Sequence, residues 1–404
     1  EQRTSRRLRR LLAMAATLAA VAVLAGALAM VQRNRADRSA VEAEDAELLA
    51  DASRLAALAL VDQRIDRALL TAAAGTGLAD TPETRAGLVQ TVQRAPFALR
   101  ISRLPNEARP QRVVLSPDEE LVAVIDNGAR IHVLDAETLE ERAALQTRDA
   151  NFDLAFLPEG DLAIGVAEED GAAIHVVDPL EPEARVARIG TSDPSPPAVS
   201  SDASGRLLLG VAVDPTGVTT TFTVWDRSSG RPVFTGQRTG IFHQTRLAPD
   251  GRSILAVTDT DLVAIDTTTG NDRWRRAGYR TIAVSPDGEL VAATVDRGPQ
   301  AQDRRYTSVA VVDLTSGAPV RTVEATAAVT ALTFGRDTLL IGTDDGTEIW
   351  EVDGERRIRL RGQANQAGAV AVSADGADAW SVSLDGTVVR WDATARSSVI
   401  RRLD

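Results

Sequence analysis

Few side chains in this 404-residue sequence have the chemistry of a catalytic or metal-binding group. The chain has no cysteine, and its 45 basic residues are all arginine. Thiolate zinc sites, cysteine nucleophiles, Schiff-base lysines and the lysine of a phosphate-binding loop are therefore excluded. The three histidines, His132, His175 and His243, do not have the spacing of metal ligands. We predict no catalytic, cofactor-binding or metal-binding residue, and no enzyme activity in this part of the protein.

Two further groups of polar residues resemble sites but have simpler explanations. His132 and His175 occupy the same place in two similar strands, so a structural repeat accounts for both. The acidic residues before Gly346 (Asp344 and Asp345) and before Gly386 (Asp385) lack the alternating acids of a calcium loop, and Asp-Gly is the favoured dipeptide of a tight hairpin. We interpret these segments as turns between strands.

One cluster of arginine and aromatic residues is the candidate for a binding surface. Such a cluster on an acidic protein suits the recognition of an acidic protein partner, and the alternative is a solvated outer strand. The predicted partner-binding patch consists of Arg273, Trp274, Arg275, Arg276, Tyr279 and Arg280.

A repeated hairpin must position these groups. In residues 282–292 two apolar strands flank a turn in which Pro286 presets φ, Asp287 bonds its own backbone and Gly288 takes a positive φ. About seven versions follow one another, spaced roughly 37 to 50 residues apart, which is the period of a four-stranded propeller blade. Each hairpin is followed by a third strand that ends in an acidic residue.

The dipeptides at Trp225 and Trp391, each followed by aspartate, together with these turns, resemble the WD-repeat β-propeller family. The resemblance implies a mainly β fold over residues 96–404, with about seven blades of four antiparallel strands. The Gly-His pair that usually opens such a blade is missing, so we expect no His–Asp network and blades held by apolar packing alone. Either residues 97–101 or residues 398–401 can supply the outer strand of the final blade.

The competing interpretation is an extracytoplasmic propeller enzyme of the quinoprotein or lactonase type. Residues 264–270, followed by Trp274, resemble one repeat of a quinoprotein dehydrogenase. A quinone site needs several such repeats with a cysteine pair or metal-binding carboxylates. One copy without cysteine favours a blade strand. We predict instead that a protein partner or an unknown small ligand binds at the propeller face.

Charge is spread unevenly along the chain, which carries −12 in total. Residues 1–38 hold eight arginines against Glu1 and Asp37, a net charge of +6, so the remainder carries −18. An acidic propeller repels phosphate backbones. We predict that this part binds no nucleic acid.

The segment from Leu11 to Val31 is uncharged, with Thr17 as its one polar side chain. As a helix it would span roughly 31 Å, enough for a bilayer core. Residues 1–35 are thus predicted to be a basic flank and a transmembrane helix, 11–31, in a single-pass protein of the cell membrane. Five arginines before it and three after it favour a cytoplasmic N-terminus and an extracytoplasmic propeller. The alternative is a cleaved export signal ending near Ala29.

Residues 36–95 are predicted to form a helical linker or stalk. Good helix formers run from residue 36 to about 74, and residues 75–77 are expected to end that helix. A second helix begins with Thr81 as N-cap and Pro82 as its first residue, and ends near Arg94. An apolar stripe from Leu48 to Leu69 gives an alternative role, a parallel dimer through the helix of residues 48–70.

The order of these parts resembles the C-terminal half of large actinobacterial STAND-type regulators, with the motifs at residues 54–60, 66–70 and 80–85 followed by blades. In that family a DNA-binding or transcriptional-activator domain and a nucleotide-binding domain precede a membrane segment. The resemblance implies that this chain senses or scaffolds and that an ATPase lies upstream.

Overall fold

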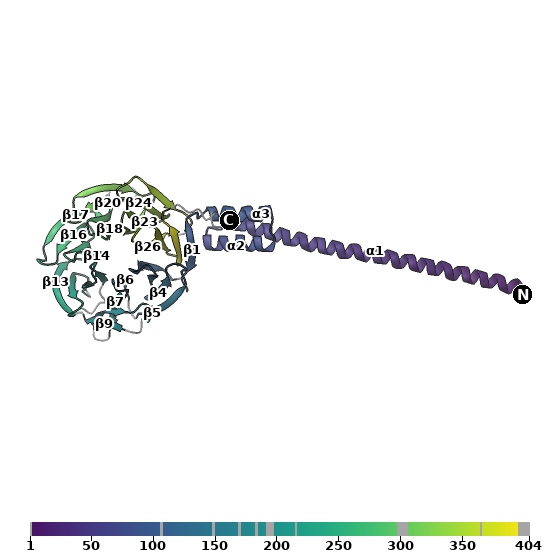
Figure 1. Ribbon diagram of the computed structural model, residues 1–404, viewed down its shortest axis with the longest axis horizontal. Helices are drawn as coiled ribbons and strands as arrows, with labels where there is room; N and C mark the ends of the chain where they lie inside the picture. Colours follow the sequence, from purple (N-terminus) through teal and green to yellow (C-terminus); the bar gives the residue numbers. More distant parts are fainter. Residues whose placement is uncertain are drawn as a thin grey trace. The chain divides into compact units, whose positions relative to one another are not determined.

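The computed structural model of the chain describes residues 2–105, 108–147, 150–168, 171–181, 185–190, 198–214, 216–296, 306–363 and 366–394. Side chains are not described for residues 2–20 and for a few residues beside the gaps. The chain divides into two compact units, one of Glu1–Asp62 with Arg67–Thr91 and one of Gln63–Asp66 with Val92–Asp404. The first is helical and the second contains the ring of strands seen in Figure 1.

Three helices precede the strands, and their bounds differ from those predicted. They are α1 (Gln2–Val61), α2 (Ile65–Leu78) and α3 (Pro82–Gln93). The expected helix over residues 36–74 is thus split after Val61, and the stripe for a dimer lies on two helices rather than one. Leu48 and Leu58 of this stripe are exposed, whereas Ile65 is buried.

α2 ends at Leu78, directly after the glycines that were predicted to end it, and close packing accounts for Gly75 within its last turn. A Cβ at Gly75 would lie 3.0 Å from the carbonyl oxygen of Ala52 in α1, and a Cβ at Gly87 in α3 would lie 2.9 Å from the Cβ of Ala56. Glycine therefore lets the three backbones approach one another. The packing gained there offsets the cost of about 1 kcal/mol for glycine within a helix.

The predicted start of the helix that begins at Pro82, which is α3 in the structure, is confirmed. The Oγ1 atom of Thr81 accepts a hydrogen bond from the backbone N–H of Thr84 (3.2 Å), and the Oγ1 atom of Thr84 accepts one from the N–H of Thr81 (3.0 Å). This is a reciprocal capping box with threonine in the place of the usual glutamate. Pro82 follows as the first helical residue, where its missing N–H is not needed.

The predicted membrane placement is wrong for the described part of the chain. Among the side chains that the structure describes, no helix is both long and apolar enough to cross a bilayer. Residues 21–31 are apolar, but Arg33 follows them, so the described stretch falls short of the roughly 20 residues a spanning helix requires. Residues 11–20 of the predicted segment lie outside the described side chains.

The described strands form seven four-stranded antiparallel sheets, arranged radially as blades (Figure 1), as predicted. The inner strands are β2 (Pro110–Leu115), β6 (Ala150–Phe156), β10 (Ala198–Ser201), β14 (Gln244–Leu247), β18 (Tyr279–Val284), β22 (Val329–Phe334) and β26 (Ala367–Val372). The second strands are β3 (Leu121–Asp126), β7 (Leu162–Glu168), β11 (Leu207–Val213), β15 (Ser253–Val257), β19 (Leu290–Val295), β23 (Thr338–Thr343) and β27 (Asp378–Ser383).

The third strands end in acidic residues or directly before one. They are β4 (Arg130–Asp135), β8 (Gly171–Val177), β12 (Thr219–Asp226), β16 (Asp261–Asp266), β20 (Ser308–Asp313), β24 (Gly346–Glu351) and β28 (Thr387–Asp392). The outer strands are β5 (Glu141–Gln146), β9 (Arg185–Gly190), β13 (Arg231–Thr239), β17 (Asp272–Ala277), β21 (Pro319–Glu324), β25 (Arg357–Leu360) and β1 (Ala98–Arg103).

The repeated turn joins the inner strand to the second strand by side-chain hydrogen bonds. In the fifth blade, Ser285 Oγ donates to Asp287 Oδ1 (2.5 Å) and accepts from the N–H of Leu290 (2.9 Å), while Gly288 has φ +74°. The first blade repeats these bonds, with Glu119 at φ +62° in the place of the glycine. The serine and aspartate of the repeated turn therefore stabilise these two hairpins.

The ring closes through the first of the two strands considered. β1 pairs antiparallel with β28, so that Ile101 faces Val389, and an N-terminal strand completes the last blade. The other candidate, residues 398–401, lies outside the described residues. Closure by a strand from the opposite end of the sequence joins the last blade to the start of the ring.

The expectation of apolar packing alone is wrong, because tryptophan and histidine side chains also form polar links. Trp274 Nε1 donates to the carbonyl of Leu314 in the next blade (2.8 Å), and Trp380 Nε1 of the last blade donates to the carbonyl of Ala136 in the first (3.0 Å). His132 is buried, with its ring nitrogens 3.3 Å from Asp126 Oδ2 and 2.9 Å from Glu141 Oε2. A His–Asp contact thus exists without the Gly-His pair.

Candidate functional site

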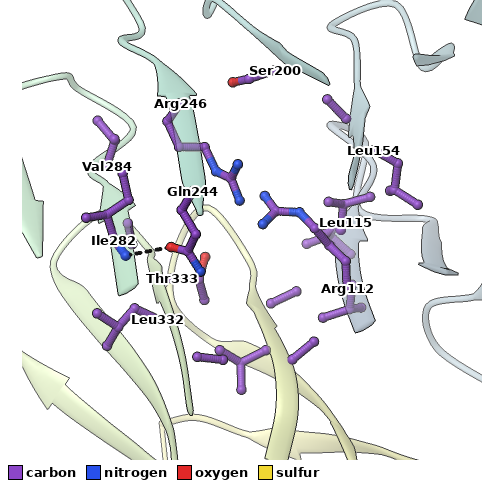
Figure 2. A pocket seen from close by; sticks show the side chains of 18 of the residues that line it. Arg112, Leu115, Leu154, Ser200, Gln244, Arg246, Ile282, Val284, Leu332 and Thr333 are labelled. Carbon is purple, nitrogen blue, oxygen red and sulfur yellow. Dashed lines mark hydrogen bonds between the residues drawn. The ribbon is translucent and has the colours of Figure 1, made fainter. Parts of the chain in front are cut away.

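The inner strands enclose a central cavity of about 500 Å³. Its walls come from all seven blades, and Figure 2 shows part of the lining. Hydrogen bonds between blades hold this lining in place. Gln244 Oε1 accepts from the backbone N–H of Ile282 (2.8 Å), and Ser200 Oγ accepts from the N–H of Leu247 (3.1 Å). The cavity is therefore a preformed feature of the ring.

Two charged residues, Arg112 and Arg246, line this cavity, and both pair with Asp153 of a third blade. Arg112 of β2 places Nε 2.7 Å from Asp153 Oδ1, and Arg246 of β14 donates from Nη1 to Asp153 Oδ2 (2.9 Å). Asp153 belongs to β6 of the second blade, whereas Arg112 lies in the first blade and Arg246 in the fourth. Figure 2 shows the guanidinium groups of Arg112 and Arg246 pointing toward one another. We call these three residues the channel triad.

Burial governs the ionisation of the triad's carboxylate. The Asp153 side chain is 12% exposed, and burial raises its pKa to about 6, although the Arg112 charge and the N–H of Leu154 oppose this shift. The carboxylate is thus ionised at pH 7 and takes up a proton as the pH falls through 6. At neutral pH the triad carries two positive charges and one negative charge.

The sequence did not single out the channel triad. Arg112, Asp153 and Arg246 each lie in the strand before a repeated turn, two to four residues from that turn. A charged residue at that place in an inner strand faces either the core or the channel, and the channel solvates it more easily. That pattern was the available signal, but one sequence does not show that the three strands converge.

The predicted partner-binding patch lies on two strands. Arg273, Trp274, Arg275 and Arg276 belong to the outer strand β17, and Tyr279 and Arg280 to the inner strand β18 of the following blade. Trp274 is 8% exposed and packs in the core between these two blades. The structure therefore places three of the arginines on an outer strand and Arg280 on an inner strand, and it removes the indole from the surface. Whether they bind a partner stays a prediction.

Each arginine of the patch already has partners within the propeller. Arg273 pairs with Asp266 (2.7 Å), and Arg275 pairs with Asp261 (3.0 Å) and Asp272 (3.1 Å). Arg276 Nε donates to the carbonyl of Gly317 (2.9 Å). Arg280 Nε donates to Asp296 (3.2 Å), and its guanidinium lies over the ring of Tyr306. These surface pairs hold the arginines in fixed orientations.

The remaining candidates have the structural roles that the sequence favoured. His243 Nε2 lies 2.6 Å from Asp259 Oδ1, and His175 is buried in β8. The aspartates before Gly346 and Gly386 lie in turns between second and third strands. The described residues contain no group of three or more His, Cys, Asp or Glu side chains that could hold a metal ion.

A second cavity, of about 240 Å³, lies at the turns of the first two blades. Burial, followed by the charges of Glu159 and Asp178, raises the pKa of Asp161, while Arg227 lowers it. This end of the two blades is acidic. The carboxylates around this cavity are Asp118, Glu120, Asp135, Glu159, Asp161 and Asp178.

The carboxylate that ends β12 makes stability depend on pH. Asp226 accepts hydrogen bonds from Ser228 Oγ (2.5 Å), Arg206 Nε (2.8 Å) and the N–H of Ser229 (3.0 Å), which together hold its pKa below the usual range. A depressed pKa in the folded state gives stability that is present above about pH 3.9, the unfolded value, and lost as the pH falls.

We expect Asp226→Asn to lower the melting temperature at pH 7, and the difference from the unsubstituted protein to shrink as the pH falls below about 3.9. Thermal unfolding followed by circular dichroism between pH 7 and pH 2.5 measures both quantities. Asp51→Asn, at an exposed position of α1, is the control. A difference that stays constant with pH would rule out this role for the carboxylate.

Comparison with known proteins identifies the fold. No known family of sequences and no curated protein sequence matches the chain. Among solved structures, the WD40 domain of Pan2 from Neurospora crassa is similar, with a TM-score of 0.60 and 11% sequence identity. The match covers 76% of this chain and 97% of that domain. The second unit of the chain is therefore a WD40-type seven-bladed β-propeller.

Proposed function

We propose that the propeller is a non-catalytic interaction module, which binds a protein partner or a small ligand at its face. The observation that carries this proposal is the state of Asp153 at the central cavity. Both of its oxygens are engaged by guanidinium groups, from Arg112 and Arg246. A carboxylate held in this way is poorly placed to take a proton from a substrate.

The architecture supports binding rather than chemistry. Radial repetition presents loops at both ends of the ring and exposed outer strands at its edge. A protein interface of standard size needs about 800 Å² on each partner. A seven-bladed ring offers several such surfaces, and a WD40-type propeller suits a protein-interaction scaffold.

The partner surface that we propose is the arginine edge formed by β17 and the start of β18. Arg275 and Arg276 are exposed there, and their orientations are set by the ion pairs and hydrogen bonds described above. Preorganised guanidinium groups lose little freedom on binding and match carboxylates in a bidentate way. We therefore propose an acidic partner at this edge.

Retention of proteins from a cell extract on the immobilised chain tests this surface. We expect the Arg275→Ala, Arg276→Ala double variant to lose retention of an acidic partner by at least about tenfold. Arg142→Ala is the matched control. Arg142 lies on the outer strand of the first blade and pairs with Asp135, as Arg273 on the outer strand of the fourth blade pairs with Asp266. Equal retention by the double variant would remove this edge as the partner surface.

The rival interpretation makes a different prediction. The purified chain is expected to show no turnover with quinone cofactors, added metals or lactones. Reproducible turnover would show that the propeller is an enzyme of the quinoprotein or lactonase type and would overturn the proposal.

We propose further that the module belongs to a STAND-type regulator and passes a binding signal to an upstream ATPase. The support is the short sequence motifs of residues 54–60, 66–70 and 80–85, which fall on the three helices that precede the propeller. The reading frame upstream of Glu1 tests this proposal, since it should encode a nucleotide-binding domain. A dimer through residues 48–70 also stays a prediction, which sedimentation of the chain in solution would decide.

A further inference from the structure

We propose that the central channel binds a compact anionic group, a carboxylate or a tetrahedral oxyanion such as phosphate, between Arg112 and Arg246. This site is separate from the partner surface proposed at β17 and does not depend on it. Among the described residues that line the cavity, these two arginines are the charged ones, and the rest are apolar or neutral polar residues.

The charge count at the channel triad leaves a positive charge without compensation. Two guanidinium groups face one carboxylate, Asp153, which balances only one of them. The side chains of Arg246 and Arg112 are 15% and 29% exposed, so water solvates them only in part. Partly buried excess charge is unfavourable by itself, and an anion of opposite sign relieves it. The protein as a whole is acidic, which makes this local excess specific to the channel.

The hydrogen-bond donors of the two arginines are only partly used. Arg246 Nη1 donates to Asp153 and to the carbonyl of Thr245 (2.6 Å). Arg112 Nε lies 2.7 Å from Asp153 Oδ1 but is not aligned to donate a hydrogen bond. In the described part of the chain, no protein acceptor receives a bond from Nη2 of Arg246 or from either Nη of Arg112. These planar donors match the two oxygens of a carboxylate or phosphate.

The surroundings of the two guanidinium groups suit a small ligand. The cavity volume of about 500 Å³ falls within the range of small-molecule sites, roughly 300 to 1,000 Å³. Gln244, whose Oε1 is occupied by the N–H of Ile282, keeps its amide NH₂ as a donor in the lining (Figure 2). Thr333 adds a hydroxyl group. A small acid can therefore place its anionic group at the arginines and its remaining atoms in the channel.

Titration calorimetry of the whole chain with sodium sulfate, at constant ionic strength set by sodium chloride, tests the site. Sulfate keeps its charge from pH 5.5 to pH 8, so the protein's own groups govern the result. We expect Arg112→Gln and Arg246→Gln each to weaken sulfate binding by at least about tenfold, because each removes charge-assisted hydrogen bonds. Arg142→Gln, which removes a paired arginine from an outer strand, should bind like the unsubstituted protein.

A variant with the opposite expected effect separates a ligand site from a purely structural brace. Asp153→Asn removes the compensating carboxylate, nearly preserves its shape, and should tighten sulfate binding by at least about threefold. Parallel titrations with acetate and inorganic phosphate show whether a planar or a tetrahedral anion is preferred. Equal sulfate binding by the unsubstituted protein and both arginine variants, weaker binding by a folded Asp153→Asn, or the absence of binding of all three anions at millimolar concentration would overturn the proposal.

Discussion

Replacement of Trp391 by alanine is expected to lower the free energy of unfolding by about 4 kcal/mol. Trp391 is fully buried, and it lies in the core cluster that joins Leu340 of the sixth blade, Val389 of the last blade and Ile101 of the closing strand β1. Truncation leaves a large cavity at the joint where the first and last strands of the propeller pair. The urea concentration at half-unfolding, followed by tryptophan fluorescence and circular dichroism, measures the loss.

The variant Trp391→Phe separates packing from hydrogen bonding at this position. Trp391 Nε1 donates to Ser381 Oγ (2.7 Å), a bond that phenylalanine cannot make. We expect Trp391→Phe to cost about 1 to 2 kcal/mol, well below the alanine variant, because most of the buried ring remains. Because β1 closes the ring by pairing with the strand of Trp391, we also expect Trp391→Ala to accelerate proteolysis near β1. A loss below about 1 kcal/mol for the alanine variant would contradict this account of the joint.

Replacement of Glu348 by alanine is expected to cost about 3 kcal/mol, since it breaks a buried network. Glu348 is fully buried in β24 and accepts hydrogen bonds from the N–H of Thr326 (2.9 Å), Trp350 Nε1 (3.3 Å) and Arg357 Nη2 (2.7 Å). Thr326 Oγ1 donates to the same carboxylate. Arg357 also stacks on the ring of Trp350, with 4.9 Å between its Cζ atom and the ring centroid. Without the carboxylate these donors lose their partner.

Two further variants test whether the Glu348 network carries this stability. Glu348→Gln keeps an acceptor for Thr326 but removes the charge that Arg357 pairs with, so we expect an intermediate loss, about 1 to 2 kcal/mol. Glu351→Ala removes an exposed partner of Arg356 from the same strand and should change stability by less than about 0.5 kcal/mol. Chemical denaturation of the three variants gives these values, and an equal loss for Glu348→Ala and Glu351→Ala would refute the network.

Local chemistry explains why much of the fold could be predicted. The turn bonds of Ser285 and Asp287, the positive φ of Gly288 and the cap formed by Thr81 all involve residues within a few positions of one another. Interactions of this kind can be predicted from the sequence, because their partners are close together in it. The number of blades followed from counting such turns.

The predictions that failed depended on partners distant in the sequence. The helix over residues 36–74 was expected to be continuous, but the structure splits it after Val61, and Gly75 of α2 packs against Ala52 of α1. Trp274 was expected at a binding surface beside arginines, but the neighbouring blade buries it and accepts its N–H at Leu314. Burial of a side chain depends on what packs over it, which a single strand does not reveal.

The sequence by itself determined that this chain forms a ring of about seven repeated hairpins, because turn geometry and strand alternation act over a few residues. The tertiary structure alone decided which strand closes the ring and that Arg112, Asp153 and Arg246 meet at its centre. These three residues span more than a hundred positions, and only the fold brings both arginines within 3 Å of Asp153. Electrostatic interactions act through space, so their partners are set by the fold and not by the order of residues.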